Sequence, residues 1–508
     1  MLVCSESVNR KGQVPMKRLI AVAVGVVLLV APLVWLVVLR PAAQEIVVAI
    51  EAEPITLDPF NAVDHISPVV QQVIFEGLLA LGENNTLVPK LAESFAVRED
   101  GRAITFALRK GVRFHDGSPF DAAAVKQNFE FLLDSRNEMA RRYLFDFVDS
   151  ITVHDAHSIT FTANRADYAL AYYFAHPAAG IKSARELDKR ARDPLHNLTH
   201  TAVGTGPFRL ILWHGRRYVE LEPNPYYWDS SAKPDTRLRF LFVPDVKERA
   251  DMLRRGEAHV AFPAPSAELL QGAGSQTVDL SLSQVYFVGL NLTRRELGDV
   301  RVRRAMNYAV DRERLMAAAN MQGLPLASPV SPAIFGYTPT EVFTYNPERA
   351  RNLLDAANFS QLAPLELYVA DRAQTKALAT AIQSDLAAAG ITVEVVALPE
   401  GDLLARLDAG QAPDMWLLHW RPYSGEVFEV LATHFARQTE ERLFRARATP
   451  QMSAALKEFT ELQEMVVADA PWLFLFTPVR EAAHLRTVQG VETLANGTLS
   501  LRRIRLTP

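Results

Sequence analysis

Residues 365–395 place two short apolar strands on either side of an amphipathic helix, and this order restricts the fold more than any other feature of the chain. Residues 365–370 predict a strand. Residues 374–389 predict a helix that ends at Gly390, because glycine readily adopts the left-handed conformation at a helix end. Alternating apolar residues over 391–395 predict the next strand. A strand–helix–strand unit of this kind joins parallel strands by a right-handed crossover. The sequence therefore predicts an α/β fold.

Residues 97–133 predict a hairpin followed by a helix. Asp100-Gly101 is placed at the hairpin turn, because glycine accepts the positive φ that such turns need. Apolar residues alternate over 104–108 and predict the buried face of a strand. Asp121 is placed to cap a helix by accepting a bond from an unpaired backbone N–H, and apolar residues over 125–132 follow at helical spacing. We expect this stretch to support the fold and not to bind a ligand.

The same stretch resembles one block of the family 5 extracellular solute-binding proteins, the peptide- and nickel-binding receptors of ABC importers. Further blocks carry the resemblance in the same order over about residues 46–400: 53–59 (Glu-Pro-Ile-Thr-Leu-Asp-Pro), 74–79 (Ile-Phe-Glu-Gly-Leu-Leu), 89–94 (Pro-Lys-Leu-Ala-Glu-Ser), 204–208 (Gly-Thr-Gly-Pro-Phe), 224–228 (Asn-Pro-Tyr-Tyr-Trp) and the arginine-rich 300–312. A single short block arises easily by chance, but a shared order does not. On these residues the chain is identified as a member of the family.

The resemblance implies a two-lobed periplasmic-binding-protein fold with an extra subdomain and a ligand cleft between the lobes. Lobe I is expected over residues 45–282 and 477–508, with an inserted subdomain over about 66–190, and lobe II over residues 283–476. Closure of the lobes on a solute would combine tight capture with release to a permease. The strands expected to cross between the lobes, and to act as the hinge, span residues 284–291 and 471–476.

Residues 19–39 form an uninterrupted run of 21 apolar residues. At 1.5 Å per residue in a helix, such a run covers roughly the 30 Å of a bilayer core. Lys17 and Arg18 precede it, so the positive-inside rule places residues 1–18 in the cytoplasm and the rest of the chain outside the inner membrane. The run predicts a transmembrane anchor or a signal segment of a periplasmic protein.

The sequence favours retention of this segment as an anchor. Signal peptidase needs small residues at positions −3 and −1, but cleavage after Ala43 would put Pro41 at −3, and the run is long for a signal peptide. The single cysteine, Cys4, precedes the run, so we expect neither a lipid anchor behind it nor an intrachain disulfide. Translation starts at Met1 or at Met16, and in the second case residues 1–15 are not part of the protein.

Composition fits a globular binding protein. With 508 residues, of which 22% are charged and 49% hydrophobic, the chain is long enough for two or three domains with full cores. The formal charge is −4 and no long basic run occurs, which argues against nucleic acid as a partner. We expect a monomer.

The resemblance also implies where a solute binds. In relatives that bind dipeptides, a segment after a tryptophan-ended strand carries an aspartate that pairs with the ligand's amino terminus, and an arginine elsewhere in the lobe pairs with its carboxylate. Here the tryptophan is Trp420, Tyr423 lies near the aspartate's place, and Arg372 lies near the arginine's. The acidic run that commonly follows is reduced to Glu426. The candidate ligand-binding residues are Tyr286, Asn291, Arg372, His419, Trp420, Arg421, Tyr423 and Glu426.

The missing aspartate shifts the expected ligand. An ammonium group that is desolvated in a cleft needs a counter-charge, which this segment lacks. Arg421 favours a carboxylate instead, because its planar guanidinium can bind both oxygens. Two alternatives stay open: Arg421 is solvated at the cleft rim, and Trp420 and Trp416 belong to the strand core. Strand alternation puts both tryptophans on the same face, so if one lines the cleft we expect the other to line it too.

The sequence contains no recognisable catalytic or metal-binding motif. His115, His419 and His434 lack a His-x₃-His or paired-carboxylate motif, and the motifs of hydrolases, zincins and phosphate-binding loops are missing. We therefore expect a protein that is no enzyme and needs no cofactor. A metal chelate stays open as a ligand, since nickel-binding relatives hold the metal largely through a small chelator.

Two roles follow from the resemblance. As the receptor of an ABC importer, the chain would capture a peptide-like or other polar organic solute and deliver it to permease subunits in the inner membrane. As a membrane-tethered sensor of the same fold, it would act through a separate signalling protein, because only the 18 residues before the apolar run lie in the cytoplasm.

Overall fold

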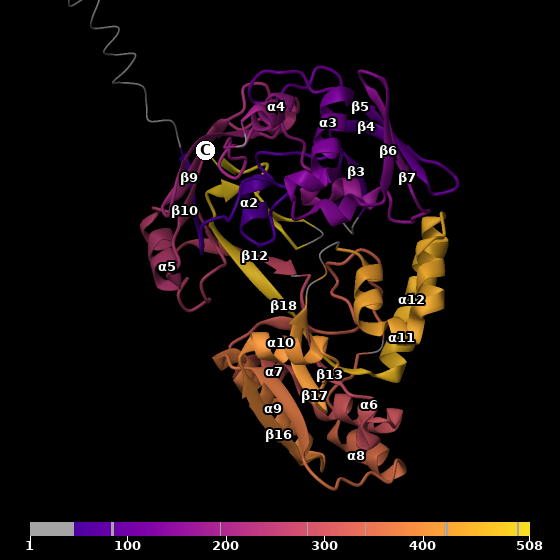
Figure 1. Ribbon diagram of the computed structural model, residues 1–508. Helices are drawn as coiled ribbons and strands as arrows, with labels where there is room; N and C mark the ends of the chain where they lie inside the picture. The colour runs from indigo at the N-terminus through magenta and orange to yellow at the C-terminus, as the bar shows by residue number, and fades with distance from the viewer. Residues whose placement is uncertain are drawn as a thin grey trace, which may run out of the picture. The chain divides into compact units, whose positions relative to one another are not determined.

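The structure is a computed structural model that describes residues 45–82, 86–193, 195–281, 283–340, 342–420, 422, 425–494 and 497–507 (Figure 1). The predicted anchor at 19–39 lies outside these residues. Among the helices that the structure describes, none is both long and apolar enough to cross a bilayer. Residues 46–508 cluster as one unit.

One sheet runs through both predicted lobes. Its main path orders the strands as β16 (Val393–Leu398), β15 (Leu365–Ala370), β17 (Met415–Trp420), β13 (Val285–Leu290), β18 (Trp472–Leu485), β11 (Val260–Phe262), β1 (Glu45–Ile50), β10 (Arg237–Phe242), β9 (Tyr218–Pro223) and β8 (Phe208–His214). β12 (Ser275–Ser281) and β14 (Gly323–Pro325) also pair with β18. β15 is parallel to both β16 and β17, and α9 (Ala373–Ala388) connects β15 to β16. The predicted strand–helix–strand unit is confirmed, and Gly390 follows the helix with φ of +93°.

The chain passes between the two parts of this sheet on neighbouring strands. The first half of β18 is antiparallel to β13, where Phe287 lies opposite Phe474. The second half is antiparallel to β12, where Leu280 lies opposite Arg480. Figure 1 shows this ribbon of β12, β13 and β18. From here on, lobe I means residues 45–282 and 477–508, and lobe II means residues 283–476.

A separate four-stranded sheet belongs to lobe I. Its strand order is β4 (Ala92–Val97), β5 (Ala103–Leu108), β7 (Ser158–Ala163) and β6 (Val148–Asp155), all antiparallel. The predicted turn is present, with Gly101 at φ of +66° between β4 and β5. The side chain of Asp121 accepts the Ala124 N–H at 2.9 Å and begins α3 (Ala122–Leu133), as predicted. Apolar residues of β5 and α3 are buried against each other.

The remaining elements surround these sheets. The other described α-helices are α2 (Ser67–Gln71), α4 (Ala184–Arg192), α5 (Val246–Arg255), α6 (Val300–Ala309), α7 (Arg312–Ala318), α8 (Pro347–Ala356), α10 (Glu400–Asp408), α11 (Val427–Arg447) and α12 (Met452–Asp469). Single 3₁₀ turns are η2 (Ser135–Asn137), η3 (Arg142–Phe145), η4 (Tyr172–Ala175), η5 (Pro177–Ala179), η6 (Ser230–Ala232) and η7 (Arg295–Leu297). Small strand pairs are β2 (Leu79–Leu81) with β3 (Leu87–Pro89), β19 (Val488–Gln489) with β22 (Arg505–Leu506), and β20 (Glu492–Thr493) with β21 (Leu499–Ser500).

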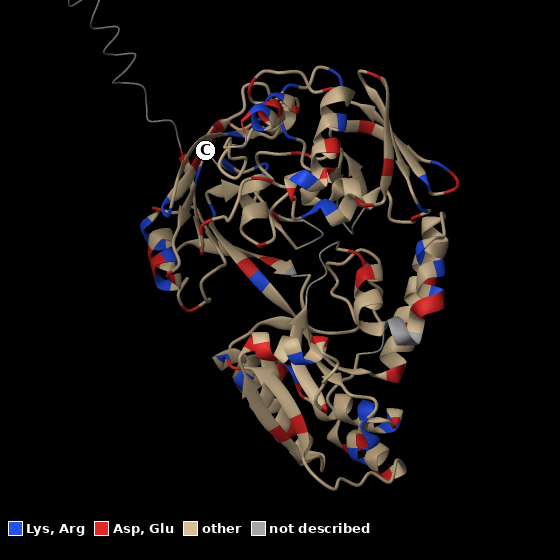
Figure 2. Cartoon of the chain, in the orientation of Figure 1, with Lys and Arg blue, Asp and Glu red and all other residues tan. Residues whose placement is uncertain are grey.

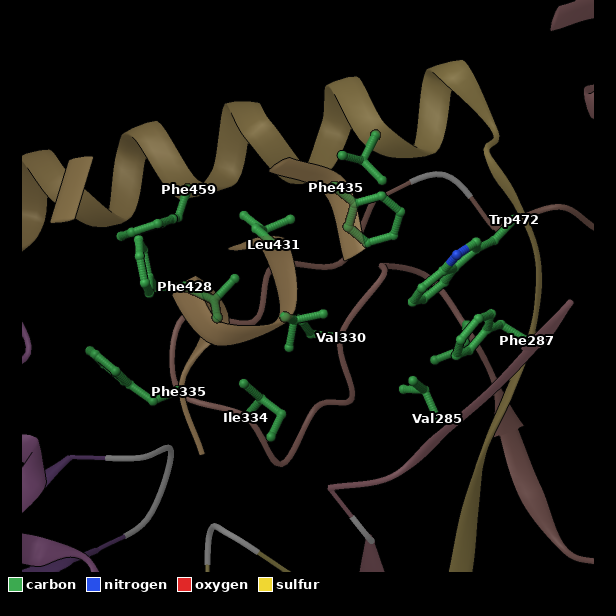
Figure 3. Packing of buried hydrophobic residues seen from close by; sticks show 14 of the residues in the cluster. Val285, Phe287, Val330, Ile334, Phe335, Phe428, Leu431, Phe435, Phe459 and Trp472 are labelled. Atoms are coloured by element: carbon green, nitrogen blue, oxygen red, sulfur yellow. The ribbon is translucent and has the colours of Figure 1, made fainter. Parts of the chain in front are cut away.

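Two large apolar clusters form the core. One fills the lobe I part of the main sheet, and the other continues from the four-stranded sheet into lobe II. Figure 3 shows the lobe II end of the second cluster, where the rings of Phe287 and Trp472 stack at 3.6 Å between centroids. Phe335 of lobe II stacks on Tyr172 of lobe I at 3.5 Å. The two lobes therefore share packed aromatic surface outside the crossing strands.

Glycines in one resembling block are explained by close packing. A Cβ at Gly204 would lie 2.2 Å from the Ile74 carbonyl oxygen, and one at Gly206 would lie 2.6 Å from the Val73 oxygen. Gly206 also donates its N–H to Ile74 at 2.9 Å. Only a residue without a side chain allows this approach.

Candidate functional site

A cavity of about 570 Å³ lies where lobe I faces lobe II. Its volume is typical of small-molecule sites, which span roughly 300–1,000 Å³. The charged, histidine and tyrosine side chains on the lobe I wall are Asp64, His65, Arg141, Tyr172, Tyr173, His176 and Arg480. The polar and aromatic side chains on the lobe II wall are Ser283, Gln284, Phe335, His419, Trp420 and Glu426.

His419 and Trp420 reach the cavity because they end β17, and ligands of open α/β sheets usually bind beyond the carboxyl ends of the strands. The half-buried ring of Trp420 meets His434 edge-on at 4.6 Å. His434 is enclosed by aromatic rings, and burial lowers its pKa to about 4. A neutral imidazole therefore supports the Trp420 ring from behind at neutral pH.

Glu426 places a carboxylate in the cavity wall at the start of α11. Its side chain accepts bonds from the hydroxyls of Tyr168 and Tyr173, the second at 3.5 Å. Burial raises the pKa of Glu426 to about 7, although the positive charge of Arg447 acts against that shift. Both tyrosines come from lobe I, so this carboxylate joins the lobes.

An ion pair beside Glu426 also crosses between the lobes. Arg447, at the end of α11, donates from Nε to Asp167 Oδ2 at 3.0 Å and from Nη2 to the Tyr173 hydroxyl at 3.0 Å. The Asp167 side chain is fully buried. Arg165 Nε lies 4.0 Å from the same Asp167 oxygen. The charged cluster therefore contains two carboxylates and two guanidiniums, and tyrosine hydroxyls bond to Glu426 and Arg447.

Arg480 brings a second guanidinium to the cavity, from the lobe I half of β18. Its Nη1 donates to Glu51 Oε1 at 3.0 Å, and the same oxygen lies 2.7 Å from His65 Nε2. The bond from His65 lowers the pKa of Glu51 against the effect of burial. The Arg480 side chain keeps 36% of its surface exposed, so it is open to a solute in the cavity.

Two other charged groups of the wall have internal partners. Arg141 is 7% exposed, and it donates from Nε to the Ala62 carbonyl oxygen at 2.7 Å. Asp64 Oδ2 accepts the backbone N–H groups of Ile66 and Ser67 at 3.0 and 2.8 Å, at the start of α2. These two side chains shape the wall and have less capacity for a solute.

Three of the predicted ligand residues lie outside the cavity wall. Arg372 pairs with Glu400 and has a side chain that is 59% exposed. Tyr286 stacks on Phe476 of β18. Asn291 binds the turn after β13 through its side-chain oxygen.

The other predicted ligand residues divide into two groups. His419, Trp420 and Glu426 line the cavity. Arg421 and Tyr423 lie outside the described residues. Contact with a solute stays a prediction for all eight residues.

Trp416 differs from its expected place beside Trp420. It packs over Gly289, where a Cβ would lie 2.2 Å from the indole, and it does not line the cavity. The two tryptophans are four positions apart along the strand, which separates their backbones by roughly 13 Å. Sharing a strand face is therefore not enough to share the cavity.

Sequence reasoning missed Arg480, His65 and the tyrosines of residues 168–173. These residues come from segments far apart, and Arg480 lies 429 positions from Glu51. One sequence signal was available for Arg480, because it follows the apolar run of the crossing strand.

A second cavity, of about 1080 Å³, adjoins the first, and the two share the lining residues Pro68, Leu81, His176, Pro177, Ala333, Gly497 and Thr498. Its other walls belong mostly to lobe I and include Lys90, whose ammonium lies 3.6 Å from the buried Glu76. Within the described part of the chain, no group of three or more His, Cys, Asp or Glu side chains is placed to hold a metal ion.

Comparison with known proteins identifies the class that this fold and cavity define. Residues 86–440 match the bacterial extracellular solute-binding proteins, family 5, and the chain belongs to that family. The glutathione-binding protein GsiB of Salmonella paratyphi A is 28% identical over 475 residues, covering 88% of this chain and 92% of that protein. GsiB of Escherichia coli K12 gives the same identity and coverage.

Solved structures show the same two-lobed periplasmic-binding-protein fold. HbpA2 from Haemophilus parasuis has a TM-score of 0.83 at 22% identity, covering 92% of this chain and all of that one. DppA from Helicobacter pylori, in complex with the peptide STSA, has a TM-score of 0.69 at 23% identity, covering 92% and 98%. The predicted fold is confirmed for the lobes.

Proposed function

We propose that this chain is the substrate-binding component of an ABC importer and captures a small peptide-like or other polar organic solute between its lobes. The observation that carries the proposal is the cavity of about 570 Å³ whose wall is built from both lobes. Such a site is completed when the lobes approach and is taken apart when they separate, which suits capture followed by release to permease subunits.

The chemistry of the wall supports a peptide-like solute. Trp420, Phe335 and Tyr172 offer apolar ring surface, while Arg480 and His419 offer polar groups that can orient a solute. Relatives named for glutathione and peptide binding agree with this size and polarity. The proposed site includes the loop from Trp420 to Glu426, with Arg372 toward its outer edge.

Binding without chemistry is part of the proposal, because the family is one of solute-binding proteins. We expect the protein to work as a monomer outside the inner membrane, tethered by residues 19–39. Membrane fractionation with N-terminal sequencing tests the tether. A soluble periplasmic form that begins near Gln44 would contradict it.

Two measurements test the proposed solute class. Mass spectrometry of small molecules that remain with the purified protein should find a peptide-like compound. Calorimetry with glutathione, dialanine and trialanine should find binding by at least one of them. A protein that binds none of these and carries no polar organic compound would contradict the proposal, as would conversion of a bound probe.

A further inference from the structure

We propose that Arg480, with Glu51 and His65 behind it, is the place where the cavity binds a carboxylate of the solute. This inference rests on the proposed function and assigns the anionic end of the solute to lobe I. The sequence predicted two arginines of lobe II as candidate ligand residues. Arg480 is a further cation, and it lies on the crossing strand itself.

The first argument is the free bonding capacity of Arg480. A guanidinium has five N–H donors, and among the described residues the bonded partner of Arg480 is Glu51, reached from Nη1. The donors on Nε and Nη2 have no partner in the described part of the chain. A planar carboxylate can accept two parallel bonds from such an edge.

The second argument compares Arg480 with the other charged groups of the wall. Arg141 is 7% exposed and donates to a backbone carbonyl and to the Tyr143 hydroxyl. Asp64 accepts two backbone N–H groups through Oδ2, and its Oδ1 is buried without a hydrogen-bond partner among the described residues. Glu426 is enclosed by two tyrosines. Arg480 combines a positive charge with open donors and a side chain that is 36% exposed.

The third argument is that Glu51 acts as an internal stand-in for the solute. Its carboxylate already bonds to Arg480 and lies 2.7 Å from His65. It holds the guanidinium at the cavity surface before a solute arrives, and it competes with an incoming carboxylate for the same charge. Removing Arg480 should therefore weaken binding of a carboxylate, whereas neutralising Glu51 should strengthen it.

The test uses matched probes and matched variants of the full chain. The probes are dialanine, trialanine and glutathione, each compared with a form in which the carboxyl groups are amidated or esterified. The variants are Arg480→Gln and Glu51→Gln. The control is Arg209→Gln, because Arg209 pairs with Glu222 at 2.6 Å with side-chain exposures of 37% and 30%, close to the 36% and 29% of Arg480 and Glu51, yet lines neither cavity.

We expect Arg480→Gln to lose about 10- to 100-fold in affinity for the acid probe and little for its neutral form. Glu51→Gln should gain about two- to fivefold, and Arg209→Gln should match the parent. General damage to the fold would lower the affinity of both Arg480→Gln and Glu51→Gln, so opposite changes in affinity support the inference.

Three results would overturn the inference. The first is equal affinity of the parent for the acid and neutral probes, and the second is an unchanged affinity of Arg480→Gln for the acid probe. Either result would show that Arg480 does not bind a carboxylate of the solute, and the proposed function would still stand. Failure of the parent to bind any probe in either form counts against both the inference and the proposed solute class.

Discussion

Tyr168 of lobe I donates its phenolic hydrogen to the carboxylate of Glu426 of lobe II, across 258 positions of sequence. Around this bond lie Tyr173, Asp167 and Arg447, and the Tyr168 ring packs on Phe335 and Phe459. A buried polar cluster therefore joins the lobes beside the candidate ligand cavity. Unpaired members of such a cluster would be costly, so its bonds fix how these surfaces meet.

The first prediction concerns pH. Burial raises the pKa of Glu426 to about 7, above the ordinary value of 4.5 that applies to the unfolded chain. The folded protein therefore holds a proton between these values that the unfolded chain releases. The contribution to stability is full below about pH 4.5 and is lost as pH rises through 7, by up to about 3 kcal/mol.

The matched variant is Glu426→Gln, which keeps the shape of the side chain but cannot ionise. The free energy of unfolding of the variant, minus that of the parent, should be larger at pH 8 than at pH 5. Urea denaturation at both pH values measures the difference, and the other titrating groups cancel because both proteins carry them. A parent–variant difference that is the same at both pH values would show that Glu426 does not titrate in this range.

The second prediction concerns the ion pair between the lobes. Arg447→Met removes the nearer of two guanidiniums beside the buried carboxylate of Asp167 and leaves Arg165 Nε at 4.0 Å. Breaking a buried pair from one side costs about 3–5 kcal/mol of unfolding free energy, and the remaining arginine places this loss at the lower end of that range. Arg442→Met is the control on the same helix, because Arg442 pairs with the partly exposed Glu458 and Glu461. Its loss should cost less than about 1 kcal/mol. Equal losses in urea denaturation would contradict the assigned burial.

The third prediction concerns Gly289. Gly289→Ala places a methyl group against the Trp416 indole, which must move, and overpacking of this kind costs about 1–3 kcal/mol. Gly401→Ala in α10 is the control, since no atom lies within 4 Å of its added Cβ and alanine favours a helix. It should be neutral or stabilising. Thermal unfolding of both variants checks the pair, and a Gly289→Ala protein as stable as the parent would show that Trp416 moves freely.

Sequence reasoning succeeded where the physical cause is local. Asp121 begins α3 by accepting a backbone N–H three residues ahead, and Gly390 supplies a positive φ just after α9. In each case the cause and its effect lie within one turn of chain. Charge and aromatic patterns in the same sequence could not show which distant segments meet.

The candidate site depends on such meetings. Glu426 meets Tyr168, and Arg480 meets Glu51, only because the chain crosses between the lobes on neighbouring strands. The resemblance to the family predicted a role for the loop after Trp420. It predicted nothing for Tyr168 or Arg480, because neither belongs to the motifs that carry the resemblance. Figure 2 shows why net charge gave little help, since acidic and basic residues are interspersed over both lobes in that view.

The last prediction separates the two tryptophans of β17. Trp420 lines the cavity and rests on the neutral His434, whereas Trp416 lies farther along the strand over Gly289. Trp420→Ala should lower the affinity for a bound acid probe by about tenfold or more, because it removes ring surface at the centre of the contact. Trp416→Ala should keep the affinity within about twofold of the parent. It should instead lose stability, because it leaves a void above a residue that has no side chain to fill it. Calorimetry and urea denaturation on the two variants measure both effects. If Trp416→Ala lost affinity and Trp420→Ala lost only stability, Trp420 would be excluded from the ligand site.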